Sequence, residues 1–167
     1  MSPLNEFRYL VLAAQRDGNR LLAEALRPLG VTPAQSEVLA VLAAVPGQAP
    51  LSLHALGARL VCETGSPSRL VAATVAAGWV ARRPVADDAR RIALALTPAG
   101  AALAAQVAAV EQEFLEELEG LLAASPQPAP LAALNDTLWR IVAHLPSGKA
   151  LRLRLAEEGA TGAPGAT

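Results

Sequence analysis

Residues that build metal, redox and disulfide sites are scarce in this sequence. Its 167 residues include one cysteine, Cys62, and two histidines, His54 and His144. These side chains do not show the spacing of a metal-ligand motif. A single cysteine cannot close an internal disulfide, which fits a reducing compartment. The sequence therefore predicts no metal site and no cofactor.

Long apolar runs are missing as well. No uninterrupted run of 18 apolar residues occurs, so we expect no membrane span. Residues 1–6 lack the basic start and apolar stretch of a signal peptide, so we expect a cytoplasmic protein. A Gly-rich phosphate loop, a nucleophile elbow and a metal motif are also missing, which argues against an enzyme. The chain is 53% hydrophobic but only 3% aromatic, because alanine and leucine dominate it. Both residue types favour helices, so the composition predicts a mainly α fold.

A repeated pair of residues marks the helix starts. A Ser or Thr followed by Pro suits the first turn of a helix, because the hydroxyl accepts a bond from an unpaired backbone N–H and Pro has no N–H to leave unpaired. The pair occurs at Ser2-Pro3, Thr32-Pro33, Ser66-Pro67, Thr97-Pro98 and Ser125-Pro126. With the apolar periodicity, it predicts helices over 3–26, 33–45, 66–78, 98–123 and 131–145, and Ser52 starts a further short helix. Residues 147–167 are predicted to form a tail that is disordered toward its end, because they are small and polar there.

Between the fourth and fifth predicted helices the apolar period changes from that of a helix to that of a strand. Residues 91–96 alternate between Arg or Ala and Ile or Leu, which is the period-two pattern of a half-buried strand. We therefore predict strands over 79–83 and 91–96, with residues 84–89 as the tip of a hairpin. Strand alternation predicts that either Arg82 or Arg83 points inward or sideways.

Charge is distributed unevenly along the chain, although the net charge is only −1. Residues 51–97 hold six arginines and three acids, whereas residues 101–123 hold five glutamates and no basic residue. Basic charge is thus concentrated over the short helices and the hairpin, where contacts to phosphate would need it.

Three short helices followed by a two-stranded hairpin is the order of a winged helix-turn-helix module. Such a module can place its last helix, here residues 66–77, in the major groove of DNA. Helical spacing turns Leu70, Val71, Thr74 and Val75 toward the core. The residues that face outward are Ser68, Arg69, Ala72, Ala73 and Ala76. The predicted fold class is mainly α with a small β hairpin, a winged helix-turn-helix flanked by long helices.

Several segments of the chain resemble the MarR family of winged helix-turn-helix transcriptional regulators. They are residues 29–35 before and into the second helix, 66–71 and 77–80 around the recognition helix, and 82–84, 88–90 and 96–100 in the wing and the start of the long helix. The resemblance covers about residues 5–146, and the wing is its most specific part. The chain departs from the family at Ala72 and Ala73, where an acid and a base are common, and at Ala89, where a base is common. We therefore expect less polar base readout and more use of DNA shape and backbone contacts.

The resemblance implies a homodimer built from the first, fifth and sixth helices. It divides the chain into an N-terminal dimerisation helix (1–30), a winged helix-turn-helix DNA-binding domain (31–97), C-terminal dimerisation helices (98–146) and the tail. It also implies a sequence-specific repressor that binds a pseudo-palindromic operator in double-stranded DNA and is released by a small-molecule or oxidant effector. The alternative is a winged-helix module that makes protein–protein contacts without DNA. An uncharged wing would indicate that alternative, whereas this wing carries Arg90 and Arg91.

The candidate DNA-binding residues lie on the recognition helix and the wing, and they are Ser66, Ser68, Arg69, Arg82, Arg83, Asp88, Arg90 and Arg91. We expect Arg69 to contact a guanine edge or a phosphate, and Arg90 to enter the minor groove. Asp88 is expected to orient a wing arginine, because a carboxylate repels phosphate. Cys62 is expected to pack as a small apolar residue and not to sense oxidants, because the chain has no second cysteine to resolve an oxidised one.

Overall fold

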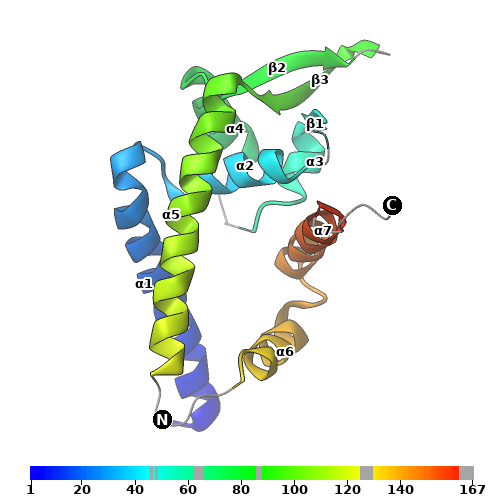
Figure 1. The fold of residues 1–167 in the computed structure, drawn as a ribbon. Coiled ribbons are helices and arrows are strands. Elements are labelled where there is room, and N and C mark those ends of the chain that lie inside the picture. The colour runs from blue at the N-terminus through cyan, green and yellow to red at the C-terminus, as the bar shows by residue number, and fades with distance from the viewer. Residues whose placement is uncertain (46, 48, 62–65, 86–87, 125–129, 162–167) are drawn as a thin grey trace, which may run out of the picture.

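The computed structural model describes residues 1–45, 47, 49–61, 66–85, 88–124 and 130–161, without the side chains of residues 85, 88–91 and 158–161. In chain order its elements are α1 (Pro3–Leu26), the 3-10 turn η1 (Arg27–Leu29), α2 (Pro33–Ala44), β1 (Leu51–Ser52), α3 (Leu53–Gly57), α4 (Pro67–Ala76), β2 (Val80–Val85), β3 (Asp88–Leu96), α5 (Pro98–Ala123), α6 (Leu131–Val142) and α7 (Pro146–Thr161). The elements from α2 to β3 form a winged lobe, from which α5 extends with α1 beside it (Figure 1). This arrangement confirms the predicted fold class.

Local hydrogen bonds explain where the helices begin. Ser2, Thr32, Ser52 and Thr97 each accept a bond from the backbone N–H three residues ahead, at 3.3, 3.3, 3.1 and 2.9 Å. At the start of α2 the hydrogen bonding is reciprocal, because Gln35 Oε1 also accepts from the Thr32 N–H at 2.9 Å. Thr32 and Gln35 together form a capping box. Ser125 lies outside the described residues, and α6 begins only at Leu131, after Pro130.

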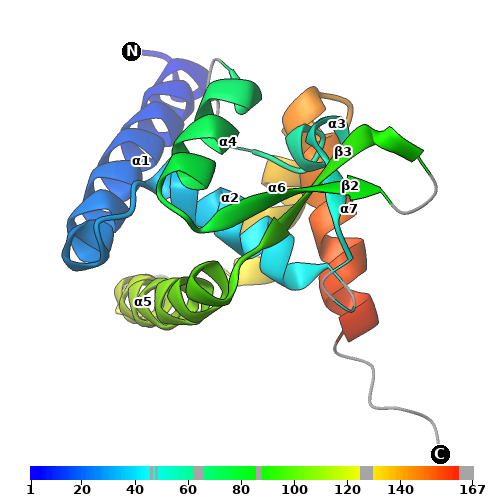
Figure 2. The same ribbon diagram turned by 90° about the horizontal axis from the view of Figure 1, so that it is seen from above.

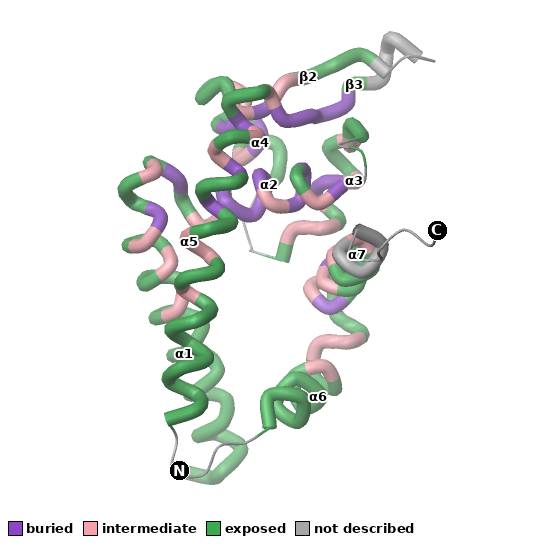
Figure 3. Tube along the Cα trace, in the orientation of Figure 1, coloured by how far each residue is buried: buried purple, intermediate pink, exposed green. Residues whose placement is uncertain are grey.

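Helix α2 forms the centre of the core. Val38 and Leu39 are fully buried. Around them lie apolar side chains from α3, α4, β2 and β3 of the lobe and from the long helices α1 and α5. These side chains are Leu26, Leu56, Val71, Val80, Leu94 and Val107. Figure 3 shows this buried zone running along α2 and the inner ends of the strands. Burying each such side chain is worth about 1.5–3 kcal/mol relative to leaving it exposed. One core therefore holds the recognition helix α4, the sheet and the first half of α5 together.

The strands form a three-stranded antiparallel sheet within the described residues, in the order β1-β3-β2. The sequence predicted the β2–β3 hairpin but not β1, whose Leu51 pairs with Leu94 of β3. Leu94 and Leu96 are buried as predicted, but Ala93 and Ala95 are buried too, at 5% and 8% exposed, so this part of β3 is covered on both faces and not half-buried. Ile92, farther out along the ribbon, is 48% exposed. Strand β1 therefore forms one edge of the sheet, directly before α3 in the chain.

Helices α1, α5 and α6 expose many apolar side chains. On α5, Val107 is buried, whereas Leu118 and Leu121 are exposed, in the half that extends beyond the winged lobe. Leu4 on α1 and Leu131 on α6 are also exposed. None of the described helices is long and apolar enough to cross a membrane.

The C-terminal part of the chain corrects the prediction of a tail from residue 147. The predicted helix over 131–145 ends at Val142, and Pro146–Thr161 forms the separate helix α7. Pro146 begins α7 without a backbone N–H that would need a partner. Ala150 is 3% exposed, and α7 packs against α2 of the winged lobe. Residues 147–161 are therefore helical because the fold gives them a surface to pack against, which local composition does not reveal.

Candidate nucleic-acid interface

Helix α4 has one buried side and one exposed side, as its spacing predicts. Val71 and Thr74 are buried, and the Thr74 hydroxyl donates to the Val71 carbonyl at 2.9 Å. Leu70 and Val75 pack on the same core. The side chains on the other face are exposed: Ser68, Arg69, Ala72, Ala73 and Ala76. Because Ala72 and Ala73 are small, the α4 backbone can approach a surface closely with Arg69 beside it.

The first turn of α4 differs from the other helix starts. Ser66 occupies the N-cap position, but its hydroxyl makes no capping bond to the helix. It lies instead 2.9 Å from the Ser68 hydroxyl, while the Ser66 carbonyl accepts from the Arg69 N–H at 3.1 Å. The expectation of a side-chain cap at Ser66 was wrong. The hydroxyls of Ser66 and Ser68 are thus held side by side next to Arg69.

Both arginines of β2, Arg82 and Arg83, are exposed, so neither side chain is buried in the core. Arg82 pairs with Leu94 and Arg83 with Ala93, so the two side chains start on opposite faces of the sheet. Strand β2 is an edge strand, and a long arginine side chain at an edge can reach solvent from either face. The pair is available to phosphate on both sides of the wing.

The other candidate wing residues are Asp88, Arg90 and Arg91. Their backbone belongs to β3, and Val85 pairs with Asp88 across a break in the register next to Pro84. Their side chains lie outside the described residues, as do Asp87 and the whole of Cys62.

A compact junction fixes the winged lobe to α5. The Thr97 hydroxyl donates to the Gly78 carbonyl at 2.7 Å, and the Thr97 N–H donates to the Trp79 carbonyl at 3.0 Å. Gly78 has a φ of 78°, a left-handed conformation that glycine adopts without strain. The exit of the recognition helix is therefore bonded directly to the start of the long helix.

Arg59 does not belong to the candidate interface, although it is one of the six arginines of the basic segment. Its guanidinium pairs with Glu157 of α7 at 2.7 Å and is only 17% exposed. No sequence motif predicts this partner, because the two residues are 98 positions apart. The basic charge available on the winged lobe is smaller than the sequence indicates.

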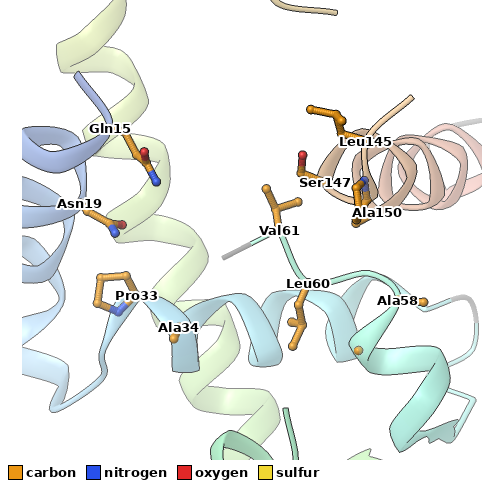
Figure 4. A pocket seen from close by; sticks show the side chains of 12 residues that line it. Gln15, Asn19, Pro33, Ala34, Ala58, Leu60, Val61, Leu145, Ser147 and Ala150 are labelled. Atoms are coloured by element: carbon orange, nitrogen blue, oxygen red, sulfur yellow. The ribbon is translucent and has the colours of Figure 1, made fainter. Parts of the chain in front are cut away.

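A groove of about 940 Å³ opens between the winged lobe and the helices outside it (Figure 4). Gln15 and Asn19 of α1 lie on one side and Ser147 of α7 on the other. Leu60 and Val61, which follow α3, form part of its apolar lining. Such a mixture of amide, hydroxyl and apolar groups suits a small, partly apolar molecule.

The fold and the exposed outer face of α4 define a winged helix-turn-helix protein. The sequence profile of the MarR family matches residues 29–91. The multiple antibiotic resistance protein MarR of Escherichia coli strain K12 is 33% identical over 110 residues, which are 65% of this chain and 74% of that protein. The chain therefore belongs to the MarR family of winged helix-turn-helix regulators.

Solved structures agree with this assignment. A mutant MarR from E. coli complexed with operator DNA matches with a TM-score of 0.68 and 28% identity, over 85% of this chain and 99% of that one. The organohalide-sensing transcriptional regulator RdhR, in its 2,4-dichlorophenol-bound form, matches with a TM-score of 0.73 over 87% of this chain and 83% of that one. At 14% identity, the second match shows a shared fold.

Proposed function

We propose that this protein is a sequence-specific DNA-binding repressor and not an enzyme, and that it acts in the cytoplasm. The observation that carries the proposal is helix α4, whose inner face is buried and whose outer face presents Ser68 and Arg69 in its first turn, followed by small alanines. The family assignment and the DNA-bound MarR relative support the same function.

On this proposal α4 enters the major groove and the β2–β3 wing lies over the adjacent minor groove. Arg69 supplies polar readout, since a guanidinium pairs well with the acceptors of guanine. Arg82 and Arg83 bind phosphate, which fixes the register of the protein on the duplex without reading sequence. Arg90 enters the minor groove, with Asp88 as its orienting partner.

We propose that the protein acts as a homodimer. A groove of about 700 Å³ separates the start of α1 from α6, and Leu4, Phe7, Leu138 and Ile141 line it. Together with the outer half of α5, it forms an apolar surface that a second copy of the chain would cover. Two-fold pairing places two α4 helices about 34 Å apart, one DNA turn, and so requires a pseudo-palindromic operator. Sedimentation showing a folded monomer at micromolar concentration would contradict this.

The groove beside Gln15 and Ser147 is the proposed site of a small-molecule effector. It touches both the winged lobe and the helices proposed to dimerise, so a ligand there could change how the two lobes of a dimer are spaced. The probe is 2,4-dichlorophenol, the aromatic bound in the structure of the related regulator RdhR. We expect it to release DNA from the wild type and to act more weakly on Gln15→Ala. An equal effect on both proteins would remove this groove from the proposal.

Sequence-specific DNA binding is tested in two steps. Binding sites are first selected from fragmented genomic DNA, and the affinity for the recovered sequence is then measured by gel retardation. We expect one pseudo-palindromic sequence to be enriched and bound at least about a thousandfold more tightly than random DNA. Recovery of unrelated fragments with equal affinity would contradict sequence-specific regulation.

A further inference from the structure

Helix α7 contacts the winged lobe through a buried carboxylate. Arg154 Nη1 lies 3.0 Å from Glu37 Oε1 of α2, and Glu37 is only 6% exposed. The same Glu37 oxygen accepts from the backbone N–H of Val61 at 2.7 Å. Val61 belongs to the segment that leads from α3 toward α4. One carboxylate therefore joins α7 to the chain that enters the recognition helix.

A second ion pair joins α7 to Arg59, in the turn that follows α3. Arg59 Nε donates to both carboxylate oxygens of Glu157, at 2.9 and 3.2 Å, and Nη2 donates to Oε1 at 2.7 Å. Arg59 Nη1 also donates to the Ala55 carbonyl at 2.7 Å, which holds the guanidinium against α3. Both side chains of the pair are more than four-fifths buried. Multiple bonds between buried planar groups fix orientation as well as distance.

The opposite side of α7 is fixed to α6. Arg152 Nη2 donates to the Ala143 carbonyl at 3.0 Å, and the guanidinium lies 5.0 Å from the centre of the Trp139 ring. A Cβ added at Gly148 would overlap the Val142 carbonyl, so α7 begins in direct contact with the end of α6. Figure 1 shows α7 between α6 and the winged lobe, and Figure 2 shows that α7 lies on the side of the molecule opposite α1.

We propose that α7 is a strut that fixes the position of the winged lobe relative to α6, with Arg154 and Glu157 as its positioning residues. The two ion pairs reach different parts of the lobe, α2 and the turn that follows α3, so they resist rotation of α7 against the lobe as well as its separation from the lobe. This inference rests on the proposed function, because two lobes of a dimer must be held at a set spacing to fit both half-sites. Loss of the strut would let α6 move relative to each winged lobe, and DNA binding would become less selective for that spacing.

The test compares Glu157→Arg, which repels Arg59, with the charge-swapped double variant Glu157→Arg and Arg59→Glu. Operators from the genomic selection are made with the half-sites at their natural spacing or moved apart by two base pairs. Glu24→Arg is the matched control, since it disrupts an exposed ion pair with Arg20 on α1, outside the winged lobe. Glu157→Gln removes the ion pair with Arg59 without introducing a repulsive charge. It gives the same test if Glu157→Arg does not fold.

We expect the wild type and the Glu24→Arg control to prefer the natural spacing about tenfold, and Glu157→Arg or Glu157→Gln to prefer it less than about threefold. The double variant should recover most of the preference, which a general loss of stability would not explain. Exchange of the Val61 amide hydrogen should be faster in Arg154→Gln than in the wild type. A wild type that selects no DNA would contradict the proposed function, whereas unchanged spacing preference in a DNA-binding Glu157 variant would contradict the strut alone.

Discussion

Gly100, in the first turn of α5, lies directly against the backbone carbonyl of Trp79, at the exit of the recognition helix. A Cβ added at Gly100 would overlap the oxygen of that carbonyl. The Thr97 hydroxyl accepts from the Gly100 N–H at 2.9 Å and donates to the Gly78 carbonyl. The long helix and the winged lobe are thus joined backbone to backbone, with no side chain between them.

Gly100→Ala should therefore destabilise the fold by at least about 2 kcal/mol, because backbone must move to admit the methyl group. Chemical denaturation measures the change. Gly120→Ala is the matched control, since it lies in the same helix with open space around it, and alanine favours a helix over glycine by up to about 1 kcal/mol. Equal stability of the two variants would show that the backbone at Trp79 can move to admit the methyl group at little energetic cost.

Arg69→Ala should weaken operator binding by about 1–3 kcal/mol and remove discrimination at one position in each half-site. The reason is that Arg69 is exposed in the first turn of α4, next to Ser68. Binding to a set of single-base operator variants measures the effect, with Arg27→Ala in η1 as a control for loss of surface charge. Uniform weakening on all sequences would make Arg69 a phosphate contact.

Arg90→Ala should weaken binding to operators with A·T-rich flanks much more than to those with G·C-rich flanks. A narrow A·T-rich minor groove has enhanced negative potential and attracts inserted arginine. Arg90→Lys should recover only part of the loss, because an ammonium is more strongly hydrated. Matched DNAs that differ only in their flanks give the measurement. Equal losses on both would indicate a phosphate contact, and no loss would remove Arg90 from the interface.

Cys62→Ser should leave DNA binding and its response to peroxide unchanged. The adjacent Glu63 disfavours a thiolate, and the chain contains no second cysteine to form a disulfide within it. Gel retardation with and without peroxide compares the two proteins. Release of the wild type from DNA by peroxide, with the Ser variant retained, would identify Cys62 as a sensor.

The sequence by itself determined the α-helices from α1 to α6, the β2–β3 hairpin and which face of the recognition helix is buried, but neither β1 nor α7. The cap at Thr32 needs only Gln35, three residues ahead, so its geometry is a local property of the chain. The buried side of α4 follows from helical spacing at Val71 and Thr74 in the same way. The roles of Arg69 and Arg90 in binding DNA stay predictions.

Only the tertiary structure decided which surfaces those elements meet. Glu37 and Arg154 are 117 positions apart, and nothing in either segment indicates the other. Strand β1 has two residues and exists because β3 pairs with it. Residues 147–161 are helical and pack against α2 and α6. Arg59 forms an ion pair with Glu157 and so does not contribute to the basic surface. A cap or an amphipathic period is set by neighbours within a turn of helix, whereas an ion pair or an edge strand depends on where distant segments lie after the core has formed.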